Sequence, residues 1–568
     1  MRNLRWQLLI AVGGLILILS YLLTQAPPQV SITTPAPVSG GIYHEALIGT
    51  VSRLNPILDF NNQVDHDINE LLYRGLITFD SRGIPLPDLA ESWAISADAR
   101  LYTFTLRKDI LWHDGESVQS SDVLYTFSKY QDADYPGPTE YQSFWEEIKI
   151  VELDERTIQF QLPEPFAPFI DFLSVGLLPE HLLRGVSAGE LIDHPFNTEP
   201  IGTGPFKFNR FVLNGEKIEG VELQAFNQFY EGRPYLDEFI FHFYPDESTA
   251  FQAYLNGEIM GISHVSGAFL DQALEIPTLN LHSARLPKIY IIFLNLNHPQ
   301  KQFFSEKLLR RALLQSINRQ WIIDSVFSGQ AIIAPGPIFP STWAYLDKLV
   351  PWPFDIREAN SLLTELGWEL PEGATPNTPE YLRKNEDTNL TFSLVHASNE
   401  LHTALAETIA ASWAQIGVQV ELVSVEPEEI LSTYLEPRDF EAVLTVIDLS
   451  SFSDPDPYPF WHDSQVETGQ NYAGFTDRNI GIWLEKARTT SDLTTRADLY
   501  KSFQFRFNDQ LPALILFSPI YNYAIDADIL GVSVGPMYDP SDRFHNILEW
   551  FIQVQPITET TVPSSSTP

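Results

Sequence analysis

Cysteine is absent from the chain, and basic residues are scarce. Without cysteine there can be no disulfide bond, thiolate metal ligand, catalytic thiol or lipid-modified cysteine near the N-terminus. The 35 lysine and arginine residues face 74 aspartate and glutamate residues, and the formal net charge is −39. A surface this acidic repels phosphate backbones, so nucleic acid is not an expected partner. Because the acids are scattered along the chain, we interpret them as a solvated acidic shell in preference to a dedicated cation-binding surface.

The N-terminal segment, residues 1–23, is the clearest local signal. It carries Arg2 and Arg5 ahead of an apolar run without charge, and the next basic residue is Arg53. The length of this run lies between a long signal-peptide core and a short membrane helix. The positive-inside rule places everything after it outside the cytoplasm. We expect an N-terminal hydrophobic helix that is either an uncleaved membrane anchor or a signal cleaved after Ala26, and an exported body in both cases.

The remainder is a long body with low-complexity ends. Residues 24–41 are rich in proline, serine and threonine, which predicts a linker. Residues 554–568 have the same composition, which predicts a disordered tail. A chain of 568 residues is too long for one compact core, so two or three domains are expected.

Side-chain periodicity predicts a mixed α/β body. Tyr102, Phe104 and Leu106 alternate with polar residues, as in a half-buried strand, and Asp114-Gly115 follows as a turn. Antiparallel hairpins are expected early in the body, and helix–strand units later. Helical spacing of apolar residues is found in 120–130, 305–327, 355–368, which ends near Gly367, and 400–425, in which a glycine separates a helix from a strand.

His113, Asp114 and Glu116 lie close together in the sequence and raise the question of an acid–base or metal site. Adjacent side chains diverge on an extended chain, and no HExxH spacing brings them onto one helix face. We therefore interpret this stretch as a turn between a strand and a helix.

Several segments, taken in order, carry a family resemblance. The longest, 71–127, combines a Leu-Ala-Glu-Ser-Trp element, an alternating strand that ends in Leu-Arg, a Trp-His-Asp-Gly turn and a helix. Through this segment and those that follow, the chain resembles the extracytoplasmic solute-binding proteins of ABC importers, family 5, the oligopeptide, dipeptide and nickel class. The later segments are 201–208, 293–299, 310–332, 357–368, 451–465, 471–504 and 547–552.

The resemblance implies an α/β fold of the two-lobe, hinged, periplasmic-binding-protein type, class II, cluster C. Lobe I is then expected in 42–78, 196–290 and 517–553, an extra inserted accessory domain in 79–195, and lobe II in 291–516. A peptide or similar small solute would be captured in the interlobe cleft and delivered to ABC permease subunits in the membrane. The resemblance implies no catalysis, cofactor or metal, and a monomeric body.

Candidate ligand residues follow from the same resemblance. In the peptide-binding branch, an aspartate shortly before an acid–proline pair holds the α-amino group of the ligand, with a tryptophan before it. Alignment on Asp454-Pro455 puts Ser451 at the aspartate position and Asp448 at the tryptophan position. A hydroxyl cannot neutralise an ammonium group, so Asp448, Asp454 or Asp456 is expected to replace it. The alternative is that Asp454 and Asp456 are turn residues held by the neighbouring prolines.

Three aromatic residues and one arginine complete the candidates. Trp343 and Tyr345 follow a proline-rich segment, and Trp461 follows the Asp-Pro-Asp turn. Loops supply cleft walls, where such rings grip side chains or stack on sugars; ordinary packing beneath a loop is the alternative. Arg53 lies where the first lobe is expected to reach the cleft and is a candidate partner for a carboxylate, with an exposed salt bridge as the alternative.

Two other functions were compared with a transport receptor. A membrane-anchored solute sensor or scaffold with the same fold is favoured by the N-terminal helix and by the missing lipid-modified cysteine. An extracellular glycosidase would need two carboxylates placed across a cleft, and no spacing in the sequence indicates such a pair. The chain has no GxxxxGK[ST] loop, so any ATP hydrolysis belongs to another subunit.

Overall fold

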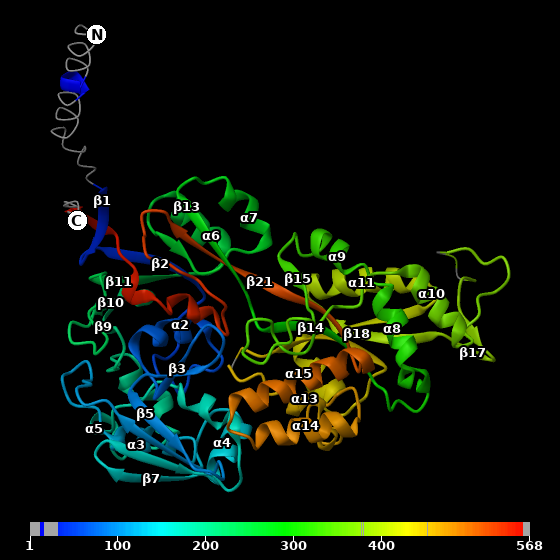
Figure 1. Cartoon of the computed structure of the whole chain (residues 1–568), viewed down its shortest axis with the longest axis horizontal. Coiled ribbons are helices and arrows are strands. Elements are labelled where there is room, and N and C mark those ends of the chain that lie inside the picture. Colours follow the sequence, from blue (N-terminus) through cyan, green and yellow to red (C-terminus); the bar gives the residue numbers. More distant parts are fainter. Residues whose placement is uncertain (1–11, 16–31, 377, 379, 451–452, 560–568) are drawn as a thin grey trace, which may run out of the picture.

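The structure is a computed structural model, shown in Figure 1. Most of the expected N-terminal hydrophobic helix lies outside the described residues. Residues 12–15 are the described part of this segment, and they are helical. Among the helices that the structure does describe, none combines the length and the apolar character needed to cross a bilayer. The described residues are 12–15, 32–376, 378, 380–450 and 453–559.

The two ends of the body meet in a small sheet. Strand β1 (Ile32–Val38), from the segment predicted as a linker, pairs antiparallel with β22 (Gln553–Glu559), most of which comes from the segment predicted as a tail. The described ends of the chain therefore lie side by side, at the top left of Figure 1.

A twelve-stranded sheet runs through the molecule in the order β19-β18-β20-β14-β21-β12-β2-β11-β10-β9, with β13 and β15 also paired to β21. We call the half with β2 and β9 to β13 the first lobe, and the half with β14, β15 and β18 to β20 the second lobe. The strands are β2 (Ile42–Ile48), β9 (Phe206–Asn214), β10 (Lys217–Ala225), β11 (Glu238–Tyr244), β12 (Gly261–Ile262), β13 (Leu279–Arg285), β14 (Lys288–Leu294), β15 (Ala331–Ile333), β18 (Thr391–Ala397), β19 (Gln419–Val425), β20 (Ala442–Asp448) and β21 (Leu514–Asp526).

Strand β21 belongs to both lobes (Figure 1). Its first residues pair with β14, as in Tyr290 opposite Phe517, and its last residues pair with β12 and β13, as in Leu279 opposite Asp526. The chain also passes from one lobe to the other in the short connection between β13 and β14. These two adjacent passages are the covalent links between the two halves of the large sheet.

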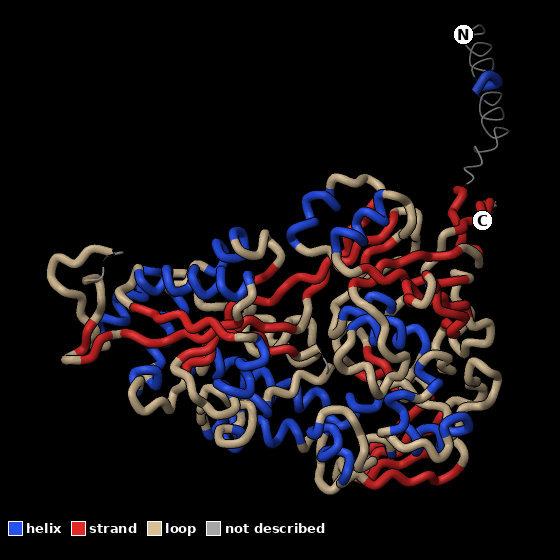
Figure 2. The backbone as a smooth tube through the Cα atoms, turned by 180° about the vertical axis from the view of Figure 1, so that it is seen from behind, coloured by secondary structure: helices blue, strands red, loops and turns tan. Residues whose placement is uncertain are grey.

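The second lobe has helices on both faces of its strands (Figure 2). Residues 289–294 of β14 are all buried, and their continuous apolar sequence is typical of a strand covered on both sides. The longer helices of this lobe are α8 (Lys307–Gln315), α9 (Arg319–Ser325), α10 (Ile356–Glu365), α11 (Glu400–Ala414), α14 (Arg478–Arg488) and α15 (Leu493–Gln510). Shorter elements are α12 (Pro427–Glu429), α13 (Tyr458–Trp461), β16 (Lys384–Asn385) and β17 (Thr388–Asn389).

Two of the predicted helices end as expected, and one is broken. Gly367 follows α10 with φ +82°, and Gly417 separates α11 from β19 with φ +77°, the left-handed backbone that glycine adopts without strain. The single helix expected over 305–327 is wrong, because α8 ends at Gln315 and α9 begins at Arg319. The side chain of Asn318 accepts from the backbone N–H of Trp321 at 3.1 Å and so starts a new helix.

A separate four-stranded antiparallel sheet, of order β5-β6-β8-β7, lies below the first lobe in Figure 1. Tyr102, Phe104 and Leu106 are all fully buried, which confirms the predicted alternation. We call this sheet, with its helices, the accessory region. Its elements are β5 (Ala90–Ile95), β6 (Leu101–Leu106), α3 (Ser120–Ser128), α4 (Thr139–Glu146), β7 (Lys149–Asp154), β8 (Thr157–Gln161), the 3-10 helix Ala167–Leu173 and α5 (Glu180–Leu183).

The turn at His113 joins the accessory region to the first lobe. The backbone N–H of His113 donates to Gly202 O at 2.9 Å, and the backbone N–H of Gly202 donates to His113 Nδ1 at 3.1 Å. Gly115 donates to Trp112 O at 2.9 Å and has φ +96°. The interpretation as a turn is confirmed, and the imidazole is used to fix the backbone of the following segment.

The buried apolar residues form separate clusters in the two lobes. One cluster combines the accessory region with the first lobe, and two others cover the opposite faces of the second-lobe strands. A smaller cluster lies under α6 (Glu247–Leu255) and α7 (Gly267–Leu274). The remaining first-lobe elements are α2 (Gln63–Leu72), β3 (Ile77–Phe79) and β4 (Pro85–Pro87). The second lobe therefore has cores separate from that of the first lobe and the accessory region.

Candidate functional site

A cavity of about 1160 Å³ lies between the lobes, and we call it the cleft. Its wall combines four regions that are far apart in the sequence. The first lobe contributes α2 and the loop before it, the accessory region contributes residues from Tyr130 to Gly176, and the C-terminal segment contributes Ser533 to Asn546. The second lobe contributes Lys288, Asp448, Ser450 and Ser453.

The second-lobe wall of the cleft is built at the ends of two paired strands. Lys288 begins β14 and lies opposite Asp448, which ends β20, so the register brings the two side chains together. Lys288 Nζ is 2.8 Å from Asp448 Oδ2, and the backbone N–H of Ser450 donates to Asp448 Oδ1 at 3.0 Å. Burial acts to raise the pKa of Asp448, but the hydrogen bonds from Lys288 and Ser450 hold it below its ordinary value.

The first-lobe wall is the polar face of α2. Val64, Ile68 and Leu71 are buried on the opposite face, while His66 and Asn69 line the cleft. This division follows from helical spacing, since residues three and four apart share a face.

Three side chains on this wall are linked through one carboxylate. Asn69 Nδ2 donates to Asp59 Oδ2 at 2.9 Å, and His66 Nδ1 is 3.3 Å from the same oxygen. On its other side, His66 Nε2 is 3.6 Å from Asp539 Oδ1. Desolvation acts to lower the pKa of His66, but the Asp539 and Asp59 carboxylates raise it well above its ordinary value. The His66 imidazole therefore lies between two carboxylates that favour its protonated form.

A buried ion triad holds this wall in place. Arg543 Nη2 is 2.8 Å from Glu45 Oε1 and 2.7 Å from Asp67 Oδ2, and all three side chains are at most 4% exposed. The Tyr523 hydroxyl donates to Glu45 Oε2 at 2.7 Å. The triad connects β2, α2, β21 and the 3-10 helix Pro540–Phe544, so the cleft wall and the strand between the lobes share one polar network.

Aromatic rings from the accessory region form the end of the cleft near Asp59. The ring centroid of Tyr130 is 5.1 Å from that of Tyr135, 6.2 Å from that of Tyr141 and 5.7 Å from that of Trp145. All four of these residues line the cleft. Burial, and secondly the Asp59 carboxylate, raise the pKa of Tyr141 above its ordinary value, so Asp59 and this ring are electrostatic neighbours.

The lobes touch along one side of the cleft. The backbone N–H of Asp454 donates to Asp171 Oδ2 at 2.5 Å, and the backbone N–H of Trp343 donates to Arg82 O at 2.9 Å. Burial and the neighbouring Asp454 carboxylate raise the pKa of Asp171 well above its ordinary value. These contacts join the second lobe to the accessory region and to the first lobe.

The structure places the candidate acids in different surroundings. Asp448 lines the cleft, and Ser451 lies outside the described residues. Asp454 is buried, with Oδ2 2.6 Å from Arg496 Nη1, while its Oδ1 has no partner among the described atoms. Asp456 Oδ2 is 2.7 Å from Arg488 Nη2. Asp454 and Asp456 are thus each paired with an arginine of the second lobe, and neither lines the cleft.

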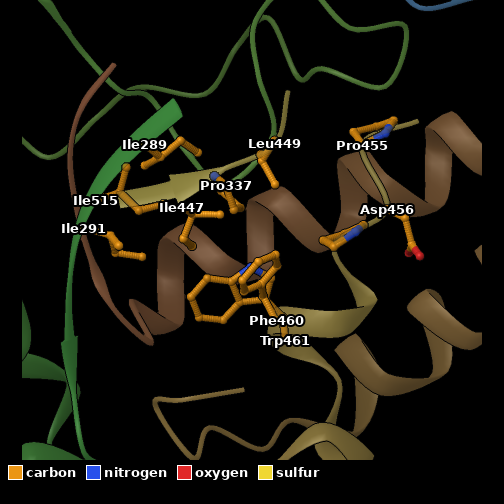
Figure 3. A pocket seen from close by; sticks show the side chains of 11 residues that line it. Ile289, Ile291, Pro337, Ile447, Leu449, Pro455, Asp456, Phe460, Trp461 and Ile515 are labelled. Carbon is orange, nitrogen blue, oxygen red and sulfur yellow. The ribbon is translucent and has the colours of Figure 1, made fainter. Parts of the chain in front are cut away.

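Trp461 and Asp456 line a second, much smaller pocket (Figure 3). Its volume is about 10 Å³, enough for about one water molecule. In Figure 3 the ring of Trp461 faces isoleucines of β14 and β20, and the Asp456 carboxylate points away from them. The ring also packs edge-on against Phe507 at 4.6 Å between centroids.

The other candidates do not line the cleft either. Trp343 is buried against Tyr500, with centroids 5.7 Å apart, and Arg496 lies 5.1 Å from its ring. Tyr345 is partly buried in the same segment. Arg53 Nε donates to the backbone carbonyl of Ile192 at 2.9 Å. Arg496 thus brings Trp343 and Asp454 together, in the core of the second lobe.

Sequence reasoning did not find Asp59, His66 or Asn69, nor the tyrosines that end the cleft. One local signal was available, because His66, Asn69 and Glu70 are three and four residues apart and fall on one face of α2. No local signal connects this face with Asp539 or with Tyr130, since both are brought to it by the tertiary fold.

The chain is similar to known proteins over most of its length. A family model described as bacterial extracellular solute-binding proteins, family 5, middle, matches residues 85–470. The chain is 27% identical over 537 residues to the dipeptide-binding protein of Escherichia coli (strain K12), covering 89% of this chain and 95% of that protein.

Two solved structures share the fold. The oligopeptide-binding protein AppA from Bacillus subtilis in complex with a nonapeptide is 24% identical, with a TM-score of 0.66 over 91% of this chain and 100% of that chain. NikZ from Campylobacter jejuni in complex with Ni(L-His) is also 24% identical, with a TM-score of 0.66 over 90% and 99% of the two chains. The mixed α/β fold of this chain therefore matches structures that hold chemically different ligands.

Proposed function

The chain belongs to the bacterial extracellular solute-binding proteins of family 5, and from this we propose that it captures a peptide or similar small solute in the cleft and delivers it to the permease of an ABC importer. The family is non-enzymatic. Reversible binding, without covalent change of the solute, is then the whole chemical task of the cleft.

The observation that carries this proposal is the cleft itself. Its volume of about 1160 Å³ exceeds the usual range for one drug-sized molecule, about 300–1000 Å³, and accommodates a short peptide. Its wall combines aromatic rings with charged side chains from both lobes, so a bound solute contacts the two halves at once. Contacts to both halves favour the closed arrangement over an open one by their differential binding free energy.

We assign the α-amino group of a peptide to Asp448. Lys288 Nζ already occupies a cationic position 2.8 Å from this carboxylate, and an incoming ammonium group is a donor of the same charge and similar size. Asp448 is 49% exposed, so the exchange needs no rearrangement of the core. Ser451, three residues after Asp448 in the sequence, is proposed to add a hydroxyl contact.

Closure is proposed to occur by rotation of the second lobe about its two links to the first lobe. The chain crosses only within β21 and between β13 and β14, which is a hinge of the kind that closes around ligands. The contact from Asp454 N–H to Asp171 Oδ2 at 2.5 Å then acts as a closure contact on the far side of the cleft.

The family is extracellular, and we propose that the N-terminal hydrophobic segment brings the body there. Whether it anchors the protein or is removed is decided by N-terminal sequencing of the mature protein. A blocked or native Met1 terminus indicates an anchor, and a terminus at Pro27 indicates cleavage after Ala26.

Native mass spectrometry of the purified protein tests the proposed function, followed by thermal unfolding with dipeptides, longer peptides and metal chelates. A solute present at about 100 times its Kd is expected to stabilise the folded state by about 2.7 kcal/mol. The result that would overturn the proposal is conversion of the solute into product, or a screen in which no peptide shifts the unfolding temperature and no solute co-purifies.

A further inference from the structure

The cleft is strongly acidic in its lining. Its only lysine and arginine among the described lining residues are Lys288 and Arg74, and each is already paired. Lys288 is 2.8 Å from Asp448, and Arg74 Nη1 is 3.1 Å from Glu70 Oε1. The remaining carboxylates of the lining have no lysine or arginine within it: Asp59, Asp80, Asp88, Asp171, Asp539 and Asp542.

Most of these carboxylates are used to hold the backbone or a neighbouring side chain. Backbone N–H groups donate to Asp80 in its turn, to Asp171 across the lobes, and to Asp539 and Asp542 in the segment after Tyr538. The Tyr230 hydroxyl donates to Asp88. These five carboxylates therefore have structural roles in holding the fold.

Asp59 is different. Both of its side-chain contacts, with Asn69 and His66, are made by Oδ2, and its Oδ1 has no hydrogen-bond partner among the described residues. The side chain is only 11% exposed, so this oxygen cannot be fully hydrated. Even with a protonated His66 between them, Asp59 and Asp539 leave this group of three side chains with one negative charge in excess.

The groups around Asp59 are acceptors and ring faces. Asn69 is 4% exposed and lines the cleft, and its Oδ1 has no partner in the described part of the chain. The hydroxyls of Tyr130, Tyr135 and Tyr141 likewise make no hydrogen bond to any described residue. The three tyrosines line the same cavity as Asp59 and Asn69, and after burial the Asp59 charge is among the causes that raise the pKa of each tyrosine.

This arrangement suits one kind of chemical group. An ammonium or guanidinium carries several N–H donors and no acceptor, so it can bond to Asp59 Oδ1, Asn69 Oδ1 and phenol oxygens together. Tyrosine faces attract a cation through the ring quadrupole, more strongly when water is excluded. A carboxylate at the same place would face Asp59 without a compensating cation.

We propose that the Asp59 end of the cleft, formed by Asp59, Asn69, Tyr130, Tyr135 and Tyr141, is a subsite for a positively charged group of the solute. The solute class is then cationic: a peptide with a lysine or arginine side chain, or a polyamine. This rests on the proposed function in that the cleft holds the solute, but it does not require the solute to be a peptide.

Isothermal titration calorimetry on the full chain tests the proposed subsite with four probes: Ala-Arg, Ala-Leu, Ala-Glu and spermidine. Ala-Arg is expected to bind at least about tenfold more tightly than Ala-Leu, and Ala-Glu more weakly than either, because a solute without a cation leaves the desolvated Asp59 carboxylate unpaired. Asp59→Asn is expected to abolish the preference for Ala-Arg and leave Ala-Leu binding within about twofold.

The control is Asp109→Asn, an exposed carboxylate of the accessory region outside the cleft, which should change no affinity. Tyr141→Phe keeps the ring and removes one hydroxyl, and a smaller loss confined to the cationic probes supports the subsite if Asp59→Asn folds poorly. Spermidine binding that Asp59→Asn removes, without binding of any dipeptide, supports the subsite while the peptide proposal fails. Equal affinity for Ala-Arg and Ala-Leu, or absence of binding by both cationic probes, overturns the subsite.

Discussion

Replacement of Arg543 by methionine tests the role of the buried triad behind the cleft. Arg543 is fully buried and lies 2.8 Å from Glu45 and 2.7 Å from Asp67. Methionine fills a similar volume without a charge, so Arg543→Met leaves two carboxylates in the core without their cation. The Tyr523 hydroxyl still donates to Glu45, but the attraction of the guanidinium that opposed burial is gone, so the pKa of Glu45, already raised above its ordinary value, rises further.

The magnitude follows from the geometry. Removing one partner of a buried ion pair costs about 3–5 kcal/mol, because the other charge stays desolvated. Since Arg543 serves two carboxylates, we expect the upper part of that range near neutral pH. The loss should shrink toward pH 5, where the stranded carboxyls take up protons and no longer need a cation. Glu45→Gln combined with Arg543→Met should recover part of the loss.

Urea unfolding of the full chain at pH 5 and pH 8 measures this effect, with Arg184→Met as the control. Arg184 is 78% exposed and pairs with Glu180 one helical turn away at 2.6 Å, so its loss should change the free energy of unfolding far less than Arg543→Met at both pH values. A loss for Arg543→Met no larger than that of the control, or one that does not depend on pH, would refute the account of the triad.

Asp448→Asn should weaken binding of a dipeptide about tenfold or more and leave its N-acetylated form unaffected, because only a free ammonium needs the carboxylate; calorimetry with both forms decides this, and equal losses contradict the assignment. Burial raises the pKa of Asp88 from 3.8 to about 7. Its contribution to stability is therefore complete below about pH 4 and is lost as the pH rises toward 7, so Asp88→Asn should flatten the fall of Tm between pH 5 and 8, and an unchanged slope would count against it. Asp171→Ala removes the acceptor of the Asp454 N–H across the lobes and should raise the Kd of a bound solute about 2- to 10-fold. Small-angle scattering should show a larger radius of gyration for this variant without solute, and identical curves would exclude a closure contact at this position.

The sequence predicted the fold where local pattern is enough. The alternation of Tyr102, Phe104 and Leu106 gave β6, and Gly367 marked the end of α10, because each depends on neighbours a few residues away. The break at Asn318 was missed, since apolar spacing continues across it and only the capping of Trp321 N–H separates α8 from α9.

The candidate site was predicted less completely than the fold. Asp448 was named through the family resemblance and lines the cleft, and its role as a ligand residue stays a prediction. The same reasoning also named Asp454, yet its partner is Arg496, 2.6 Å away and on α15, which no sequence spacing indicates. The scattered acids were interpreted as a solvated shell, but several of them gather in the cleft, where they have no lysine or arginine partner within its described lining.

The sequence by itself determined the periodic elements and the sign of the net charge, since these are properties of composition and of residues close in the chain. It indicated the class of protein only through the ordered segments that carry the family resemblance. Only the tertiary structure decided which polar groups share a site. Asp59, His66, Tyr141 and Asp539 come from different elements and meet because two lobes and an accessory region pack around one cavity. The physical reason is that convergence depends on long-range packing of separate cores, which a local pattern does not encode.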